Sequence, residues 1–177
     1  VDLLGRGATV LSRGLLLSGG KGPSGVALQT AFRHLSAGCT SDQVQKAVLS
    51  GKGRGVFRGL IRANGEAMQT VAHQLCRSMV LQDGARLHVS PCLEIIADDV
   101  ECTHGATVAD LDEEKVFYFR ARGISAEAAR FALVRGFAQE VLQGVPYEGA
   151  RERFLADAMA LIPKREGRPD TTGWASI

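Results

Sequence analysis

Short apolar stretches, separated by glycine, aspartate, asparagine and serine, dominate the chain from residue 1 to about residue 116. Almost no segment there keeps the period of about 3.6 residues that an amphipathic helix needs. The clearest of these stretches are Val56-Phe57, Leu60-Ile61, Met79-Val80-Leu81, Leu93-Glu94-Ile95-Ile96 and Val100. They follow one another too closely for helices to fit between them. This region is therefore predicted to form short β-strands joined by tight turns.

The turns between these strands help to choose among the β architectures, since a sandwich, a barrel and a solenoid could all give this pattern. Glycine-rich turns occur at 51–55 and at Asp83-Gly84, and clear two-residue hairpin signals are few. A coiled solenoid is favoured for this reason, although no exact short repeat and no hexapeptide pattern is visible.

The pattern changes after Gly123, where helical spacing begins. Ser125 is a good N-cap, and a helix is predicted over 126–142, with Phe131 and Val134 on its broad apolar face. Gly144 and Pro146 would stop it.

A second helix is predicted from about residue 148 to 162, ended by Pro163. The polar run from 164 to 173 cannot bury enough surface to become ordered, and residues 164–177 are predicted to form a flexible tail.

Composition and charge exclude several classes of function. The chain of 177 residues has 45% hydrophobic and 23% charged residues and a net charge of +2, with basic and acidic residues interspersed. These values indicate a globular protein and argue against nucleic acid as a partner. The longest apolar run near the start is Leu15–Leu17, so no membrane-spanning segment is expected. Because the chain starts at Val1 without a leader-like pattern, its N-terminus is interpreted as cut.

Four cysteines lie far apart in the chain and form no CxxC motif, which favours free thiols in a reducing compartment. In a strand, Cys102 and His104 would point to the same face, because side chains alternate. A thiolate beside an imidazole suits iron or zinc. The alternative is a structural cysteine with a hydrogen-bonded histidine. His73 and Cys76 form a second pair that one or two solenoid coils could bring alongside His104.

Motifs of self-sufficient enzymes are missing. The segment from Gly14 to Lys21 misses the spacing of a phosphate-binding P-loop by one residue, and Gly22 stands where a hydroxyl side chain should be. No Gly-x-Ser-x-Gly nucleophile motif occurs. The acidic run 110–114 is most simply a solvated turn. Neither nucleotide hydrolysis nor serine hydrolase chemistry is expected.

Four longer segments follow one another in a characteristic order, and they are Gly53-Arg54-Gly55-Val56-Phe57-Arg58-Gly59-Leu60-Ile61, Pro91-Cys92-Leu93-Glu94-Ile95, Ala97-Asp98-Asp99-Val100-Glu101-Cys102-Thr103-His104-Gly105-Ala106-Thr107-Val108 and Phe117-Tyr118-Phe119-Arg120-Ala121-Arg122-Gly123-Ile124. Their order and spacing resemble one known family, the SufB/SufD proteins of iron-sulfur cluster assembly. The resemblance spans roughly residues 30 to 143 and is closer in the last three segments than in the first.

The resemblance implies a mainly β fold, a right-handed parallel β-helix over residues 1–122, followed by a helical segment over 123–163 and a tail over 164–177. It implies a non-catalytic scaffold subunit that pairs through its β-helix with a SufB-type subunit. The helical segment would engage a SufC-type ATPase, and a cysteine desulfurase would deliver sulfur indirectly. A transient iron-sulfur cluster would form at the subunit interface, and this chain would bind no nucleotide.

Gly105, after His104, matches the SufD type of the family, since the SufB type has Glu there. The resemblance points to His104, with Cys76 and Cys102, as candidate iron or cluster ligands, and to Phe131 and Val134 as the ATPase-docking surface. Cys76 departs from the usual SufD pattern and admits a SufB-like paralogue that pairs with itself. A stand-alone Cys/His metal enzyme and packing roles for Phe131 and Val134 remain open. A bacterial cytoplasm is expected, with a plastid stroma as the alternative.

Overall fold

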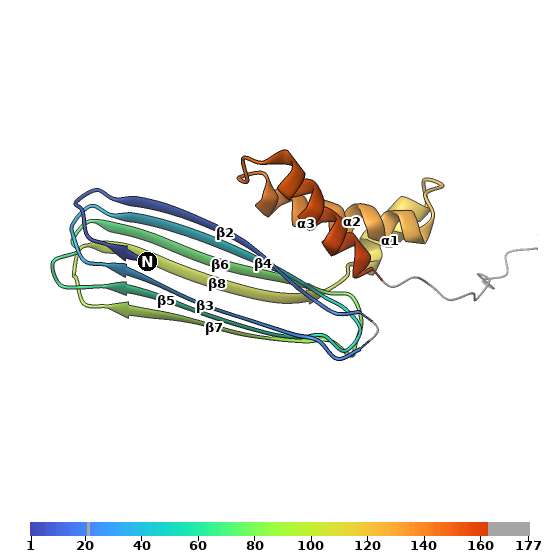
Figure 1. The fold of residues 1–177 in the computed structure, drawn as a ribbon, viewed down its shortest axis with the longest axis horizontal. Coiled ribbons are helices and arrows are strands. Elements are labelled where there is room, and N and C mark those ends of the chain that lie inside the picture. Colours follow the sequence, from blue (N-terminus) through green and yellow to red (C-terminus); the bar gives the residue numbers. More distant parts are fainter. Residues whose placement is uncertain (21, 163–177) are drawn as a thin grey trace, which may run out of the picture.

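The computed structural model describes residues 1–20 and 22–162, and the predicted tail over 164–177 lies outside this range. Eight strands precede three helices in the described residues (Figure 1). The strands are β1 (Asp2–Leu3), β2 (Thr9–Ser18), β3 (Gly25–His34), β4 (Thr40–Leu49), β5 (Arg54–Ala63), β6 (Thr70–Val80), β7 (Arg86–Ile95) and β8 (Val100–Asp110). The helices are α1 (Glu113–Arg120), α2 (Ala126–Leu142) and α3 (Glu148–Ala160).

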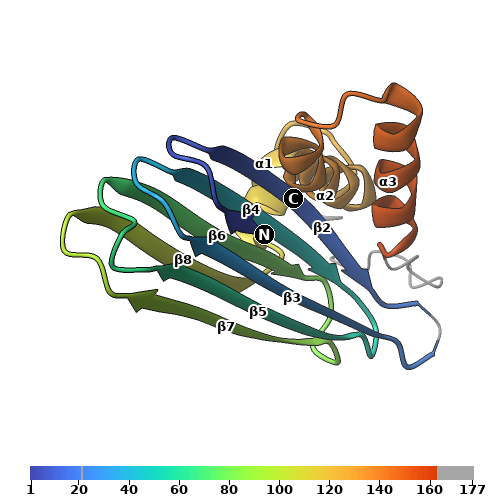
Figure 2. The same ribbon diagram turned by 60° about the vertical axis from the view of Figure 1, so that its left-hand side comes forward.

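The strands form two parallel sheets, ordered β1-β3-β5-β7 and β2-β4-β6-β8. Successive strands alternate between the sheets, so the chain winds as a flattened parallel β-helix with about 30 residues per coil (Figures 1 and 2). The register repeats from coil to coil, with Thr40 beside both Thr9 and Val71. The predicted β-solenoid is confirmed. Most of its strands have 10 or 11 residues, however, and are longer than the short strands expected.

Tight turns connect the strands at both ends of each coil. At Gly51 the backbone adopts a φ of 57°, and a Cβ there would lie 2.8 Å from the carbonyl oxygen of Gly20 in the previous coil. Only glycine fits this left-handed conformation so close to another turn. The glycine-rich sequence between β4 and β5 is therefore required by the stacking of the coils.

The interior between the two sheets changes character along the strands. One end is apolar, with a cluster of Leu16, Ala47, Leu49, Val80 and Ala85. The middle is polar, because Ser41, Gln43, Gln45 and Gln74 also face inward and are at most 2% exposed. These buried polar positions interrupt the apolar alternation that normally marks a strand in a sequence.

The helix α2 agrees with the sequence prediction at both ends, and the Ser125 hydroxyl accepts a hydrogen bond from the Ala128 N–H at 3.2 Å. The helix α1 was not predicted. Asp112 caps it by accepting from the Lys115 N–H at 3.1 Å, and Glu113 and Glu114 occupy its first turn, where acidic residues complement the helix dipole. The acidic run was therefore misread as a turn. We call α1, α2 and α3 together the helical unit, and it begins at residue 113 instead of 123.

The helix α2 packs on the outer face of the β2-β4-β6-β8 sheet, as Figure 2 shows. Lys46 on β4 points out of the β-helix and into this contact, where its side chain is 0% exposed. Its ammonium group donates to the Phe137 carbonyl at 2.8 Å and to the Glu140 carboxylate at 2.5 Å, and lies 4.4 Å from the centre of the Phe137 ring. Lys46 thus fixes the helical unit to the sheet.

Within the described residues no helix is long and apolar enough to cross a membrane.

Candidate functional site

The last coil of the β-helix ends in two uncovered strands. β7 is the terminal strand of one sheet and β8 that of the other, so each has a neighbour on one side only among the described residues. The free N–H and C=O groups of such edge strands are a template for pairing with another chain. Apolar side chains are also left uncovered at this end, because Ile95 is 40% exposed and Val108 is 52% exposed.

Cys102 and His104 lie on β8, beside Ala72 and Gln74 of β6 in the register. Ala72 and Gln74 point into the β-helix, so Cys102 and His104 occupy the equivalent inward positions of the last coil. The prediction that the two share one face is confirmed. His104 is exposed and Cys102 is half-buried, because β8 has no further strand beside it in the described part of the chain. Burial raises the pKa of the Cys102 thiol, which favours its protonated form.

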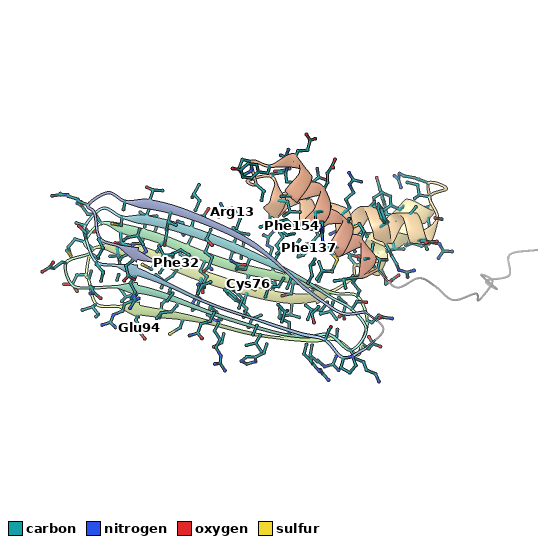
Figure 3. The ribbon with its side chains drawn as sticks, in the orientation of Figure 1. Arg13, Phe32, Cys76, Glu94, Phe137 and Phe154 are labelled. Carbon is teal, nitrogen blue, oxygen red and sulfur yellow. The ribbon has the colours of Figure 1, made fainter. Side chains whose placement is uncertain are left out.

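Cys76 lies one coil back, in the interior between the two sheets, where it is 1% exposed (Figure 3). Its neighbour on β8 is Ala106, which places the Cα atoms of Cys76 and His104 about 8 Å apart by strand geometry. Burial raises the pKa of Cys76 to about 11, partly offset by a hydrogen bond with Ser78. The thiol is therefore protonated near neutral pH. His73 points the other way, and its Nδ1 lies 2.7 Å from the Thr103 hydroxyl, so it does not join this group.

A row of buried amides leads through the interior to the position of His104. The Gln43 Nε2 donates to the Thr30 hydroxyl at 2.9 Å, and the Gln74 Nε2 donates to the Gln43 Oε1 at 2.8 Å. A Cβ on Gly59 would lie 2.3 Å from the Gln74 Nε2, so only glycine leaves room for this side chain. The Gln74 Oε1 has no hydrogen-bond partner among the described residues, although buried acceptors normally find one.

This amide row was not predicted from the sequence. The signal that could have revealed it is the alternation of polar residues in Ser41-x-Gln43-x-Gln45, which has the period of a strand but none of the apolar residues of a usual core.

The candidate residues do not close a metal site within one chain. Among residues 1–20 and 22–162, no group of three His, Cys, Asp or Glu side chains is placed to hold a metal ion. His104 and Cys102 supply an imidazole and a thiol, which suit iron once the thiol is deprotonated. Further ligands would have to come from another chain or from the cargo itself.

The helical unit carries most of the exposed aromatic side chains. Phe131 on α2 is 43% exposed, whereas Val134 is fully buried. The prediction of Val134 as a docking residue is therefore wrong, because the face of α2 that carries it packs within the protein. The exposed aromatic residues of the helical unit are Phe117, Tyr118, Phe131, Tyr147 and Phe154, and Figure 3 shows Phe154 on α3.

The fold and its open end define a class of protein: a parallel β-helix whose last coil ends in two edge strands, followed by a helical unit. Residues 1–137 match the family described as SUF system FeS cluster assembly, SufBD core domain. The chain belongs to this SufB/SufD family.

Relatives occur in bacteria, plants and parasites. The chain is 45% identical over 123 residues to the chloroplastic protein ABCI7 of Arabidopsis thaliana, covering 69% of this chain and 26% of the relative. It is 38% identical over 135 residues to the iron-sulfur cluster assembly protein SufD of Escherichia coli, covering 76% and 32%. For SufD of Plasmodium berghei the identity is 34% over 149 residues, covering 84% and 11%. The chain thus spans a third or less of the length of these relatives.

Proposed function

We propose that this chain is the pairing end of a SufD-like scaffold subunit, which has no catalytic site of its own and takes part in iron-sulfur cluster assembly. The observation that carries the proposal is the position of His104 and Cys102 on the inward side of an uncovered last coil. In that position they would lie beside the inward side chains of whatever chain extends the sheet. A nascent cluster would be the cargo of such an interface.

Pairing through β7 and β8 is favoured by the physics of the edge. A second β-helix placed end to end would satisfy the free backbone groups of both strands and cover Ile95 and Val108. A SufB-type subunit is the proposed partner, as the resemblance to SufD proteins implies. Pairing of two copies of this chain is the alternative, which the presence of Cys76 keeps open.

His104 is the residue proposed to hold iron or sulfur species at the interface, because its imidazole can coordinate iron without first losing a thiol proton. Cys102 would be a second ligand on the same face. Cys76 remains a candidate only as an interior thiol behind them, since its raised pKa makes it a poor ligand until it is deprotonated. The cysteine desulfurase would act through the partner subunits.

The helical unit is proposed to dock the SufC-type ATPase through its exposed aromatic side chains. Phe131 on α2 and Phe154 on α3 are both exposed and sit on helices that pack against each other. Exposed apolar residues gathered on one unit are typical of a protein interface. The ATPase would supply nucleotide hydrolysis, for which the described residues offer no phosphate-binding loop.

The proposal is tested on the full-length protein, purified anaerobically with its cognate SufB-type and SufC-type subunits. Iron and sulfide are measured for the wild type, His104→Ala and Cys76→Ser. We expect His104→Ala to lower both by at least about 5-fold while the complex stays assembled, as loss of a metal ligand or its support commonly does. His88→Ala is the matched control, because His88 is an exposed histidine on the outer side of the same last coil.

A full iron and sulfide load in His104→Ala would refute the role of His104. A dimer of the full-length chain alone, loaded with iron and unable to bind the SufB-type subunit, would replace the SufD-like assignment by the self-pairing paralogue. Turnover of a substrate by the isolated full-length chain with one bound metal ion would instead support the stand-alone enzyme.

A further inference from the structure

No helix of the described residues lies over the outer face of the β1-β3-β5-β7 sheet (Figure 2). This face carries a concentration of positive charge. Its outward positions hold five arginines and two carboxylates. We call this surface the arginine face, and its members are Arg33, Arg54, Arg58, Arg62 and Arg86, with the carboxylates Asp2 and Glu94. The charge of the whole chain is only +2, so this surface is far more basic than the average surface of the protein.

The charges on the arginine face are only partly compensated. Arg33 pairs with Asp2 at 2.7 Å, and Arg62 lies 3.7 Å from Glu94, which is on the outer side of the sheet in Figure 3. Arg54 and Arg58 are exposed and have no hydrogen bond or ion pair with the other described residues.

Arg86 adds a further uncompensated charge at the same end of the face. Arg54 stands beside Arg86 in the register. Among residues 1–20 and 22–162 the Arg86 guanidinium donates to backbone carbonyls alone, that of Ala85 at 2.8 Å and that of Asp83. Like charges on neighbouring strands destabilise a sheet, so the fold itself gains nothing from this arrangement.

Basic and apolar positions alternate along the central strand of the face. The outward residues of β5 are Arg54, Val56, Arg58, Leu60 and Arg62, in that order. Successive outward side chains are about 6.6 Å apart, so arginines recur about every 13 Å with an apolar side chain midway between them. Val56 and Leu60 are half-buried and lie between the arginine side chains of β5. We call these two apolar residues the apolar floor.

The alternation of basic and apolar side chains favours one class of anionic partner over others. Arginine binds carboxylates in a bidentate geometry, and the apolar floor would pack against apolar side chains. A nucleic acid backbone would leave that floor unused, and so would the headgroups of an anionic membrane. A protein segment in extended conformation has the same repeat of about 6.6 Å for side chains on one face.

We propose that the arginine face binds an extended, acidic segment of a protein partner in which carboxylates alternate with apolar side chains on one side. The site lies on the outer surface of the sheet, so it stays accessible when the β7 and β8 edges are paired. It does not involve His104 or the helical unit, and it is therefore independent of the proposed function.

The test uses the full-length protein and a fluorescent peptide of about twelve residues, long enough to follow β5 at about 3.3 Å per residue. In the matched peptide the residues of one face alternate Glu and Leu, and the other face is Ser. A scrambled peptide has the same composition and charge. Binding is measured by fluorescence anisotropy at low salt, because ion pairs on an exposed surface are screened by salt. We expect the matched peptide to bind at least about 5-fold more tightly, since only it aligns carboxylates with the arginine rows.

The variant Arg54→Ser/Arg58→Ser removes the two arginines without partners and is expected to weaken binding of the matched peptide by at least about 10-fold. The control Arg135→Ser/Arg153→Ser removes two exposed arginines from the helical unit and the same net charge. We expect a change below about 2-fold in the control, because these arginines lie far from the face.

Equal affinity for the matched and scrambled peptides would overturn the proposal, and so would an equal loss in the two double variants. Duplex DNA and phosphatidylserine vesicles are the remaining probes. If either binds more tightly than the matched peptide and loses that binding in Arg54→Ser/Arg58→Ser, the face recognises a different class of anion and the proposal fails.

Discussion

The outer faces of the two sheets differ although the same alternation of side chains produces both. On the outer face of the β2-β4-β6-β8 sheet α2 packs over β2 and β4, and the Lys46 side chain there is completely buried against Phe137 and Glu140. The outer face of the β1-β3-β5-β7 sheet has no helix from residues 1–20 or 22–162 over it, and its cations Arg54 and Arg58 remain exposed. The winding of a β-helix decides which side chains point outward, but the chain that follows it decides which of these become core.

The first test disrupts the packing of α2, on the side of the molecule that carries the helices. Val134 on α2 is fully buried, so Val134→Asp would place a carboxylate without a partner in an apolar contact, at a cost of about 3 kcal/mol or more. We expect the helical unit to become sensitive to protease while the β-helix keeps its far-ultraviolet circular dichroism. Phe131→Asp on the same helix, at a site that is 43% exposed, should cost less than about 1 kcal/mol. Similar protease sensitivity of the two variants would show that Val134 does not seal the contact.

The sequence predicted this helix better than its surroundings. The Ser125 cap and both ends of α2 were correct, because the capping signal and the apolar spacing act within the helix itself. The burial of Val134 could not be predicted, since a broad apolar stripe does not tell which part of it will find a neighbour. α1 was missed because an acidic N-cap and first turn look like a solvated turn when read alone.

In the β-helix and the candidate site, too, local features were predicted from the sequence, whereas features that depend on contacts between coils were not. Strand alternation correctly placed Cys102 and His104 on one face, a purely local inference. The length of the strands was underestimated, because Gln43 and Gln74 in the interior do not look like core residues. Their burial depends on hydrogen bonds between successive coils, and a sequence read without its register does not reveal these. The proposed ligand role of His104 involves a second chain, so no property of this chain alone decides it.

The second test concerns the ion pair between the buried Lys46 and Glu140. Glu140→Gln replaces the carboxylate by a neutral amide, whose oxygen can still accept from Lys46, so the buried ammonium group loses its charged partner. We expect a loss of about 1–2 kcal/mol at pH 7 in urea unfolding. Lys46→Met should cost less than about 1 kcal/mol, because the Glu140 side chain is 60% exposed and can be hydrated. If Lys46→Met proved the more damaging of the two, desolvation of the cation would not be the controlling effect.

The same ion pair predicts a pH dependence. The hydrogen bond from Lys46 lowers the pKa of Glu140 below its ordinary value of 4.5. A lowered carboxyl pKa means that the folded state holds its proton less tightly than the unfolded state, so the stabilisation is fully present above about pH 4.5 and is lost as the pH falls through the folded pKa. The difference between wild type and Glu140→Gln should therefore be constant from pH 5.5 to 8, within about 0.5 kcal/mol, and shrink at lower pH. A difference that persists unchanged at pH 3 would contradict the assignment.

The smallest expected effect lies on the uncovered side. Arg54 makes no ion pair with the other described residues and stands beside Arg86, so Arg54→Ser should leave the free energy of unfolding within about 0.5 kcal/mol of wild type, on the stabilising side at low salt. Because the repulsion between two exposed charges is screened, any gain should disappear at about 1 M salt. A loss of more than 1 kcal/mol, measured by urea unfolding at both salt concentrations, would mean that the arginine supports the sheet. An unchanged or increased free energy of unfolding would mean that Arg54 does not stabilise the fold. This is expected of a side chain whose charge acts on a partner and not on its own sheet.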